Sequence, residues 1–98
     1  MDYNNRAMKQ LIKRHYEATA ERGLIGPYTT THDFMEKLKE EYSEVLEAYN
    51  EETGVVDGDM VQECMDLVGV IFNMLINKGF DIEAEFKYNT EYQESRVV

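Results

Sequence analysis

The hydrophobic residues of this chain recur at helical spacing, and the longest apolar run lies within residues 63–77, ECMDLVGVIFNMLIN. Between Cys64 and Ile76 the run carries a single charged residue, Asp66. At about 3.6 residues per turn, its polar residues fall on one narrow stripe and every other side is apolar. That stripe consists of Gln62, Glu63, Asp66, Gly69, Asn73 and Asn77. A helix that is apolar nearly all round is typical of a protein interior, so we expect this helix and its stripe to be buried.

Two helices are predicted before this one. The first covers Tyr3–Arg22 and stops at the glycine that follows, because glycine commonly ends a helix. Its expected inward stripe is Met8, Leu11, Ile12, His15 and Thr19. The second is predicted to begin at Thr31 or Asp33 and to end near Asn50, and Asp33 with Glu36 resembles a capping box. Its expected core stripe is Phe34, Leu38, Tyr42, Val45 and Tyr49.

The apolar helix itself should start near Asp57 or Asp59 and end at Lys78–Gly79, a cation followed by a glycine. A last helix is predicted from Asp81 and fades into the polar tail ESRVV. No sustained alternation of the kind that predicts strands is present. We therefore expect a single domain, residues 1–98, folded as an all-α antiparallel bundle of about four helices. A chain this short cannot cover so apolar a helix alone, so we expect a homo-oligomer, most simply a two-fold dimer.

The net charge of −10 narrows the range of partners. Without a basic stripe to displace counterions, binding to nucleic acid is disfavoured, and so is binding to an anionic membrane surface. A single cysteine, Cys64, excludes an internal disulfide and fits a small core residue in a cytoplasmic protein. The N-terminus lacks the apolar core of a signal peptide, and the longest apolar run is too short to cross a bilayer.

Acidic residues three apart accompany the apolar stripes of the two middle helices. Glu41 and Glu44 lie on one edge of the second helix, with Lys37 on the same edge, and Glu63 and Asp66 repeat the spacing on the third. Two antiparallel helices would bring these four carboxylates together, where they repel one another. A divalent cation relieves that repulsion, and oxygen ligands suit Mg²⁺, Mn²⁺ or Ca²⁺. Because Mg²⁺ shares its shell with phosphates, such a site favours phosphoryl chemistry.

Simpler interpretations of the same residues stay open. Glu40, Glu41 and Glu44 also fit an ordinary solvated face of a helix. Asp66 could be a buried acid paired with Lys37 or with Arg96. Asn73, a candidate substrate contact, could be a core amide whose hydrogen bonds are satisfied within the fold.

The series Lys37-Leu38-x-Glu40-Glu41-x-x-Glu44, followed after eighteen residues by Glu63-x-x-Asp66, resembles a known signature. It is similar to the EExxE…ExxD pattern of MazG-like nucleoside triphosphate pyrophosphohydrolases, which belong to the all-α NTP pyrophosphatase superfamily. The resemblance covers residues 34–77, about half of the chain. It implies an oligomeric helical bundle that binds Mg²⁺, with Mn²⁺ as an alternative ion. It also implies hydrolysis of a nucleoside triphosphate to the monophosphate and pyrophosphate, as in housecleaning of the nucleotide pool.

The resemblance also assigns roles by motif position. It implies that the metal ligands are Glu41, Glu44, Glu63 and Asp66. Glu40 would support a further metal or the attacking water, and Lys37 would lie near the phosphates. The family often has a late basic cluster that closes over the phosphates, for which Lys87, Asn89 and Arg96 are the candidates here. The competing hypothesis is a non-catalytic acidic helical dimer that acts as a protein-interaction or nucleotide-binding module.

Overall fold

The computed structural model describes the backbone of residues 2–97 and the side chains of residues 6–97. Over this range the chain forms four α-helices and no strands, which confirms the expected all-α class. The helices are α1 (Asp2–Glu21), α2 (Thr31–Ala48), α3 (Gly58–Asn77) and α4 (Ile82–Ser95). Across the described residues, no helix combines the length and hydrophobicity that a bilayer crossing requires.

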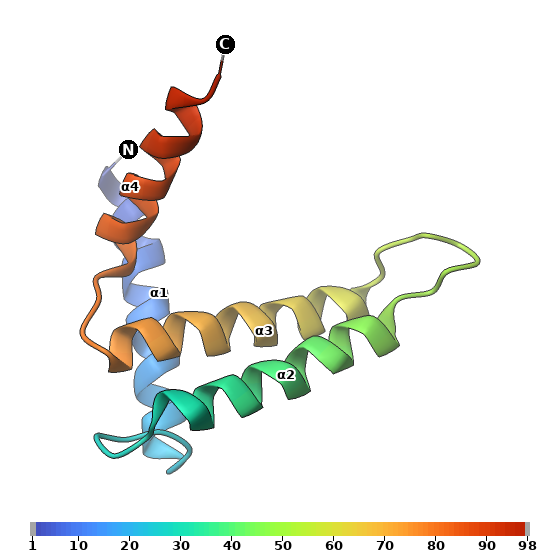
Figure 1. Ribbon diagram of the computed structural model, residues 1–98, viewed down its shortest axis with the longest axis horizontal. Helices are drawn as coiled ribbons and strands as arrows, with labels where there is room; N and C mark the ends of the chain where they lie inside the picture. Colours follow the sequence, from blue (N-terminus) through green and yellow to red (C-terminus); the bar gives the residue numbers. More distant parts are fainter. Residues whose placement is uncertain (1, 98) are drawn as a thin grey trace.

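The helices are arranged as a hairpin with two projecting arms (Figure 1). α2 and α3 lie side by side and run in opposite directions, joined by the loop of residues 49–57. α1 crosses α3 and contacts it, whereas α4 leaves the end of α3 and projects away from α2. The shape is open, with a radius of gyration of 15.6 Å. A closed antiparallel bundle, completed by further copies of the chain, stays a prediction.

Local signals set the ends of the helices. Asp57 caps α3 by accepting a hydrogen bond from the Met60 N–H, and Gly79 follows α3 with φ 90°, where glycine is favoured. The predicted capping box of α2 was assigned to the wrong pair of residues. It is formed by Thr30 and Asp33, not by Asp33 and Glu36. Because the chain becomes helical directly after Thr30, Asp33 occupies the third helical position and its carboxylate accepts from the Thr30 N–H.

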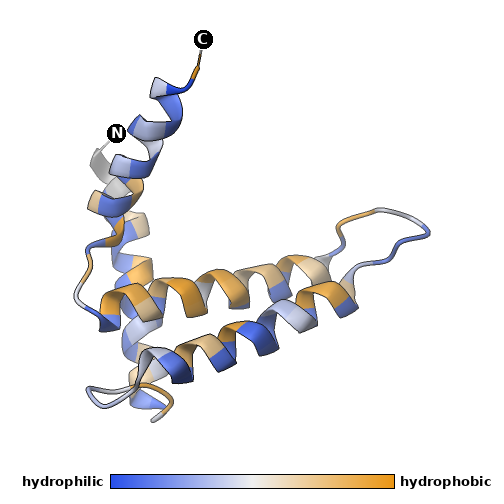
Figure 2. Ribbon diagram, viewed as in Figure 1, coloured by the Kyte–Doolittle hydropathy of each residue, from blue (hydrophilic) through white to orange (hydrophobic). Residues whose placement is uncertain are grey.

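The core of one chain is small. Among the described side chains, the buried hydrophobic one is Phe34 on α2. A single chain does not enclose α3, whose buried residues are Gly69 and Asn73. Burial of its other sides, which was expected to require further copies of the chain, stays a prediction. α2 covers one side of α3 and α1 crosses another, but the remaining side stays uncovered (Figure 2 shows α3 hydrophobic along most of its length). The large apolar residues left exposed on α3 are Val61, Met65 and Val68.

The predicted stripes of α1 and α2 are buried only in part. On α1, Ile12 and Thr19 are half-buried, but Met8, Leu11 and His15 are exposed. The reason is that α1 meets α3 at one crossing and therefore covers only a short length of its own stripe. On α2, half-buried Leu38 and Val45 accompany Phe34, whereas Tyr42 and Tyr49 are exposed.

Part of the polar stripe of α3 forms the contact with α1. A Cβ atom at Gly69 would lie 2.6 Å from His15 Cε1, so the glycine allows the imidazole to pack against the backbone of α3. Buried Asn73 donates to Thr19 Oγ1 at 3.4 Å, and its Oδ1 lies 3.4 Å from His15 Nδ1. Asn73 therefore behaves as a core amide with partners inside the fold.

Asn77 fastens the loop between α1 and α2 to the end of α3. Its side-chain amide donates to the Gly26 carbonyl at 2.9 Å and to the Tyr16 hydroxyl at 3.2 Å. The neighbouring Lys78 ammonium donates to the Thr29 carbonyl at 2.7 Å. These bonds hold the start of α2 in place against α3, and so they help to align the two helices of the hairpin.

Asn77→Ala is expected to lower the free energy of unfolding by about 1–2 kcal/mol, because it leaves the Gly26 carbonyl without its donor. The matched control is Asn89→Ala on α4, where the side chain is exposed and alanine has the better helix propensity, so stability should stay the same or rise slightly. Urea unfolding of both variants at one protein concentration tests the difference. Equal effects of the two substitutions would contradict the role of Asn77.

Candidate metal centre

The hairpin brings acids from α2 and α3 together. Carboxylate oxygens of Glu41, Glu63 and Asp66 lie within 4.8 Å of one another. A second group, formed by Glu40, Glu41 and Glu44 on α2, meets the same limit. The predicted convergence of carboxylates from the two middle helices is confirmed for Glu41, Glu63 and Asp66. Glu44, the fourth predicted member, groups with Glu40 and Glu41 on its own helix, and Glu41 is common to both groups. Their role as metal ligands stays a prediction.

Helix geometry explains the grouping. Residues three apart are neighbours on one edge of a helix, so Glu41 with Glu44 and Glu63 with Asp66 each form a local pair. Glu41 also lies on the side of α2 that packs against α3, where it is only 7% exposed. The pair on α3 therefore meets Glu41 at the contact between the two helices.

Two carboxylate oxygens in this cluster are buried without a partner. Within the described residues, Glu41 Oε2 and Glu63 Oε2 are inaccessible to solvent and accept no hydrogen bond. A buried ionised oxygen without a partner is costly, and such groups are normally paired, protonated or bound to a metal. The donor set consists of carboxylate oxygens, which hard divalent cations prefer. The residues therefore fit a cation such as Mg²⁺ at this position.

Asp66 was expected to be buried with the rest of the polar stripe, but it is exposed. It lies three residues from Glu63, which faces α2, and three from Gly69, which faces α1, so it falls between the two contacts of α3. Among the described residues, Asp66 forms no ion pair with Lys37 or Arg96, the alternative partners considered above. Lys37 pairs instead with acids of α2. Arg96 lies over the ring of Tyr92 at the far end of α4.

Lys37 partly compensates the negative charge of α2. Its ammonium lies 3.2 Å from Glu41 Oε1 and 3.6 Å from Glu40 Oε1. The hydrogen bond with Glu41 is the main cause that raises the pKa of Lys37 and keeps it charged. Burial raises the pKa of Glu41, and neighbouring Glu44 raises it further, whereas Lys37 opposes both effects. Glu41 is thus an acid that its surroundings make hard to ionise.

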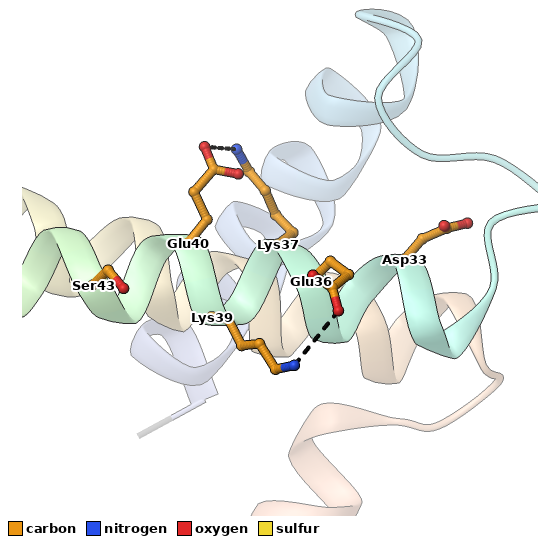
Figure 3. A pocket seen from close by; sticks show the side chains of 6 residues that line it. All are labelled: Asp33, Glu36, Lys37, Lys39, Glu40 and Ser43. Carbon is orange, nitrogen blue, oxygen red and sulfur yellow. Dashed lines mark ion pairs between the residues drawn. The ribbon is translucent and has the colours of Figure 1, made fainter.

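Two open hollows flank the cluster. The larger, of about 540 Å³, is formed by one side of α2, and Figure 3 shows Lys37 beside Glu40 and Lys39 beside Glu36 there. Its lining residues are Asp33, Glu36, Lys37, Lys39, Glu40 and Ser43. The second, of about 350 Å³, lies where α2 ends and α3 begins, next to Glu63. Its lining residues are Glu44, Glu47, Ala48, Asp59, Gln62 and Glu63. A solute can therefore approach Glu40 from the first hollow, and Glu44 and Glu63 from the second.

Sequence reasoning missed Glu47, which lines the second hollow. The sequence spacing could have predicted this residue, because Glu47 continues the three-residue spacing of Glu41 and Glu44.

The predicted phosphate contacts on α4 are not brought to the cluster within one chain. Lys87, Asn89 and Arg96 are exposed on or just after α4. α4 projects away from α2 (Figure 1), so these residues lie apart from the hairpin's carboxylates. Asn73, the remaining candidate substrate contact, lies at the crossing of α1 and α3.

Comparison with protein-family models, with curated proteins and with solved structures finds no match to this chain. The resemblance to MazG-like enzymes therefore depends on the motif residues themselves.

Glu41→Gln is expected to raise the free energy of unfolding at neutral pH, without divalent ions, by about 1 kcal/mol, because it removes a buried charge that has an unpartnered oxygen. A carboxyl with a raised pKa binds more protons in the folded chain than in the unfolded one. Its contribution to stability therefore falls as the pH rises from the ordinary glutamate value, 4.5, through the raised pKa.

The gain from Glu41→Gln should accordingly vanish when the pH falls below 4.5, where the wild-type carboxyl is protonated in both states. Urea unfolding from acid to neutral pH measures this dependence. Glu36→Gln, on an exposed side of the same helix, is the matched control and should change stability little at any of these pH values. A glutamine at position 41 that destabilises the ion-free protein at neutral pH would contradict the assignment.

Proposed function

We propose that this protein is a Mg²⁺-dependent pyrophosphohydrolase that cleaves a nucleoside triphosphate into the monophosphate and pyrophosphate. The observation that carries the proposal is the pair of buried, unpartnered oxygens on Glu41 and Glu63 within a cluster of acids from two helices. The motif spacing of Glu40, Glu41, Glu44, Glu63 and Asp66, which resembles that of MazG-like enzymes, supports it.

In this proposal Glu41, Glu44, Glu63 and Asp66 hold the ion. Their carboxylates supply oxygen donors alone, as Mg²⁺ and Mn²⁺ prefer. Bound there, the ion would offset the charge of the triphosphate and of the leaving pyrophosphate. The exposed flank of the cluster, at Asp66, lets a substrate phosphate approach from solvent.

Two further residues of α2 have proposed roles in the reaction. Lys37 holds its ammonium at the edge of the cluster, where it can contact phosphate oxygens and stabilise charge that develops on them. Glu40 is exposed beside it, where water can reach its carboxylate, so it suits a general base that takes a proton from water.

We propose that the active form is a homodimer or tetramer. Lys87, Asn89 and Arg96 lie apart from the cluster of their own chain, so contact with substrate would require another copy to deliver them. The activity would serve housecleaning of the cytoplasmic nucleotide pool.

A panel of nucleoside and deoxynucleoside triphosphates with Mg²⁺, assayed by pyrophosphate release, is expected to show turnover of at least one member. Glu63→Gln and Asp66→Asn should each lower turnover by at least about a hundredfold, because each removes a ligand, and loss of a mere supporting residue already costs about 10–100-fold. Far-ultraviolet circular dichroism should show that both variants keep their helices, and Glu36→Gln should keep wild-type turnover. Wild-type turnover in either ligand variant would refute the assignment.

Millimolar Mg²⁺ or Mn²⁺ is expected to raise the melting temperature, since an ion that binds only the folded chain stabilises it by about 2.7 kcal/mol at a hundred times its Kd. NaCl at matched ionic strength controls for screening of the charge of −10. Glu63→Gln should reduce the rise in melting temperature that Mg²⁺ causes and should not change the rise that NaCl causes. A response to Mg²⁺ no larger than the response to NaCl would favour the non-catalytic acidic interaction module instead.

A further inference from the structure

Lys37 is the counter-cation that the chain itself supplies to the carboxylate cluster. The cluster consists of Glu40, Glu41, Glu44, Glu63 and Asp66. The Lys37 ammonium lies 3.2 Å from Glu41 Oε1 and 3.6 Å from Glu40 Oε1. No lysine or arginine occurs between Lys39 and Lys78, although that segment contains every acid of the cluster. Among the ion pairs of the described residues, those of Lys37 are therefore the ones that reach the cluster.

The pair that Lys37 forms with Glu41 is suited to exchange. Glu41 is buried, whereas the side chain of Lys37 is 49% exposed, so the ammonium reaches the carboxylate from the solvent side. The lysine precedes the glutamate by four residues, which is the weaker of the two possible orders on a helix. A flexible, half-exposed lysine stem can also turn its ammonium into water at little cost. The contact is consequently one that a better cation can replace.

The ammonium neutralises only part of the cluster. Lys37 lies beside Glu41 Oε1, but Glu41 Oε2 and Glu63 Oε2 are buried and accept no hydrogen bond within the described residues. An ammonium is a compact single charge, and this one is paired with acids of α2 alone. A divalent cation carries twice the charge and takes several oxygen ligands at once. It therefore suits the oxygens of both helices better than Lys37 does.

An ion bound at Glu41 and the Lys37 ammonium would share one carboxylate and repel each other. Like charges a few ångströms apart interact strongly in a partly buried site, because little water lies between them to screen the repulsion. The lysine is the member of this pair that can move, since its side chain is half-exposed. Once released, its ammonium can pair with a phosphate oxygen, which is also an anionic acceptor.

We propose that Lys37 and a divalent cation exchange at Glu41, so that binding of the ion displaces the ammonium and makes it available to a phosphate oxygen of the substrate. The exchange sets an order of binding, because a phosphate compound without a divalent ion meets a lysine that is already paired. The inference rests on the ion ligands of the proposed function and not on hydrolysis. A chain that shows the exchange but releases no pyrophosphate would therefore count against the hydrolase alone.

Titration with Mg²⁺ alone, by isothermal titration calorimetry at mildly alkaline pH, tests the exchange. Lys37→Met keeps an unbranched stem and removes the charge, so it should tighten Mg²⁺ binding by about tenfold, because the ion no longer meets a like charge. Lys37→Arg keeps the charge and should bind Mg²⁺ no more tightly than the wild type. A Lys37→Met variant that binds Mg²⁺ no more tightly than the wild type would overturn the exchange.

Lys39→Met is the matched control. It changes the net charge by the same amount, but Lys39 pairs with Glu36 at 3.5 Å and points away from Lys37 (Figure 3). Its effect on Mg²⁺ affinity should be about twofold or less, since solvent screens so exposed a charge. Without divalent ions, Lys37→Met should melt at a lower temperature than Lys39→Met, because it leaves buried Glu41 without its counter-charge. Equal gains in Mg²⁺ affinity for the two variants would overturn the exchange in favour of a general charge effect.

A second measurement uses the wild-type chain and so does not depend on whether a variant folds. In protein labelled with ¹³C at lysine, the Cε signal of Lys37 should move toward the position of a free lysine as Mg²⁺ is added, and that of Lys39 should stay fixed. A Lys37 signal that stays fixed while calorimetry shows Mg²⁺ bound would overturn the exchange. Absence of Mg²⁺ binding would overturn the ion ligands with it, and pyrophosphate release from the same sample reports separately on the hydrolase.

Discussion

Packing of α2 against α3 places an aromatic ring and a carboxylate in the same contact. Phe34 and Glu41 are seven residues apart on α2, hence on one side of the helix, and both are buried there. The hydrophobic contact that forms the hairpin therefore takes Glu41 out of water as well. Glu63 comes to the same contact from α3, with one oxygen buried. The stability of the hairpin and the ionisation of Glu41 are consequently coupled, because burial raises the pKa of this carboxyl. A cation at the cluster would act on both.

Much of the helical framework follows from signals a few residues long. Asp57 and Gly79 delimit α3 because a capping carboxylate and a left-handed glycine act on the adjoining turn only. The convergence of Glu41 with Glu63 was likewise predictable, since three-residue spacing and a short loop between antiparallel helices determine which edges meet. The capping box of α2 was assigned to the wrong pair because Thr30 and Asp33 both suit a helix start, and only the backbone conformation at Thr30 distinguishes them.

Burial was harder to predict than helical structure. An apolar surface must be covered, but helical spacing does not say which element covers it. The sequence therefore indicated that one chain leaves part of α3 uncovered, but not which side of the helix that would be. The polar stripe of α3 shows the same difficulty. Glu63 and Asn73 share that stripe, yet Glu63 meets α2 and Asn73 meets α1. Asp66 lies between the two contacts and stays exposed, an outcome that depends on where α1 crosses. A single stripe in the sequence thus serves two contacts in the fold.

The crossing of α1 over α3 has a consequence for sequence variation. His15 occupies the space that a side chain at position 69 would need. The side chains at positions 15 and 69 therefore share one limited space. Their combined volume is constrained, whereas the volume of either side chain alone is not. Among natural variants of this chain, bulk gained at position 69 should appear together with bulk lost at position 15. Covariation of the residues at these two positions would therefore indicate, from sequences alone, where α1 crosses α3.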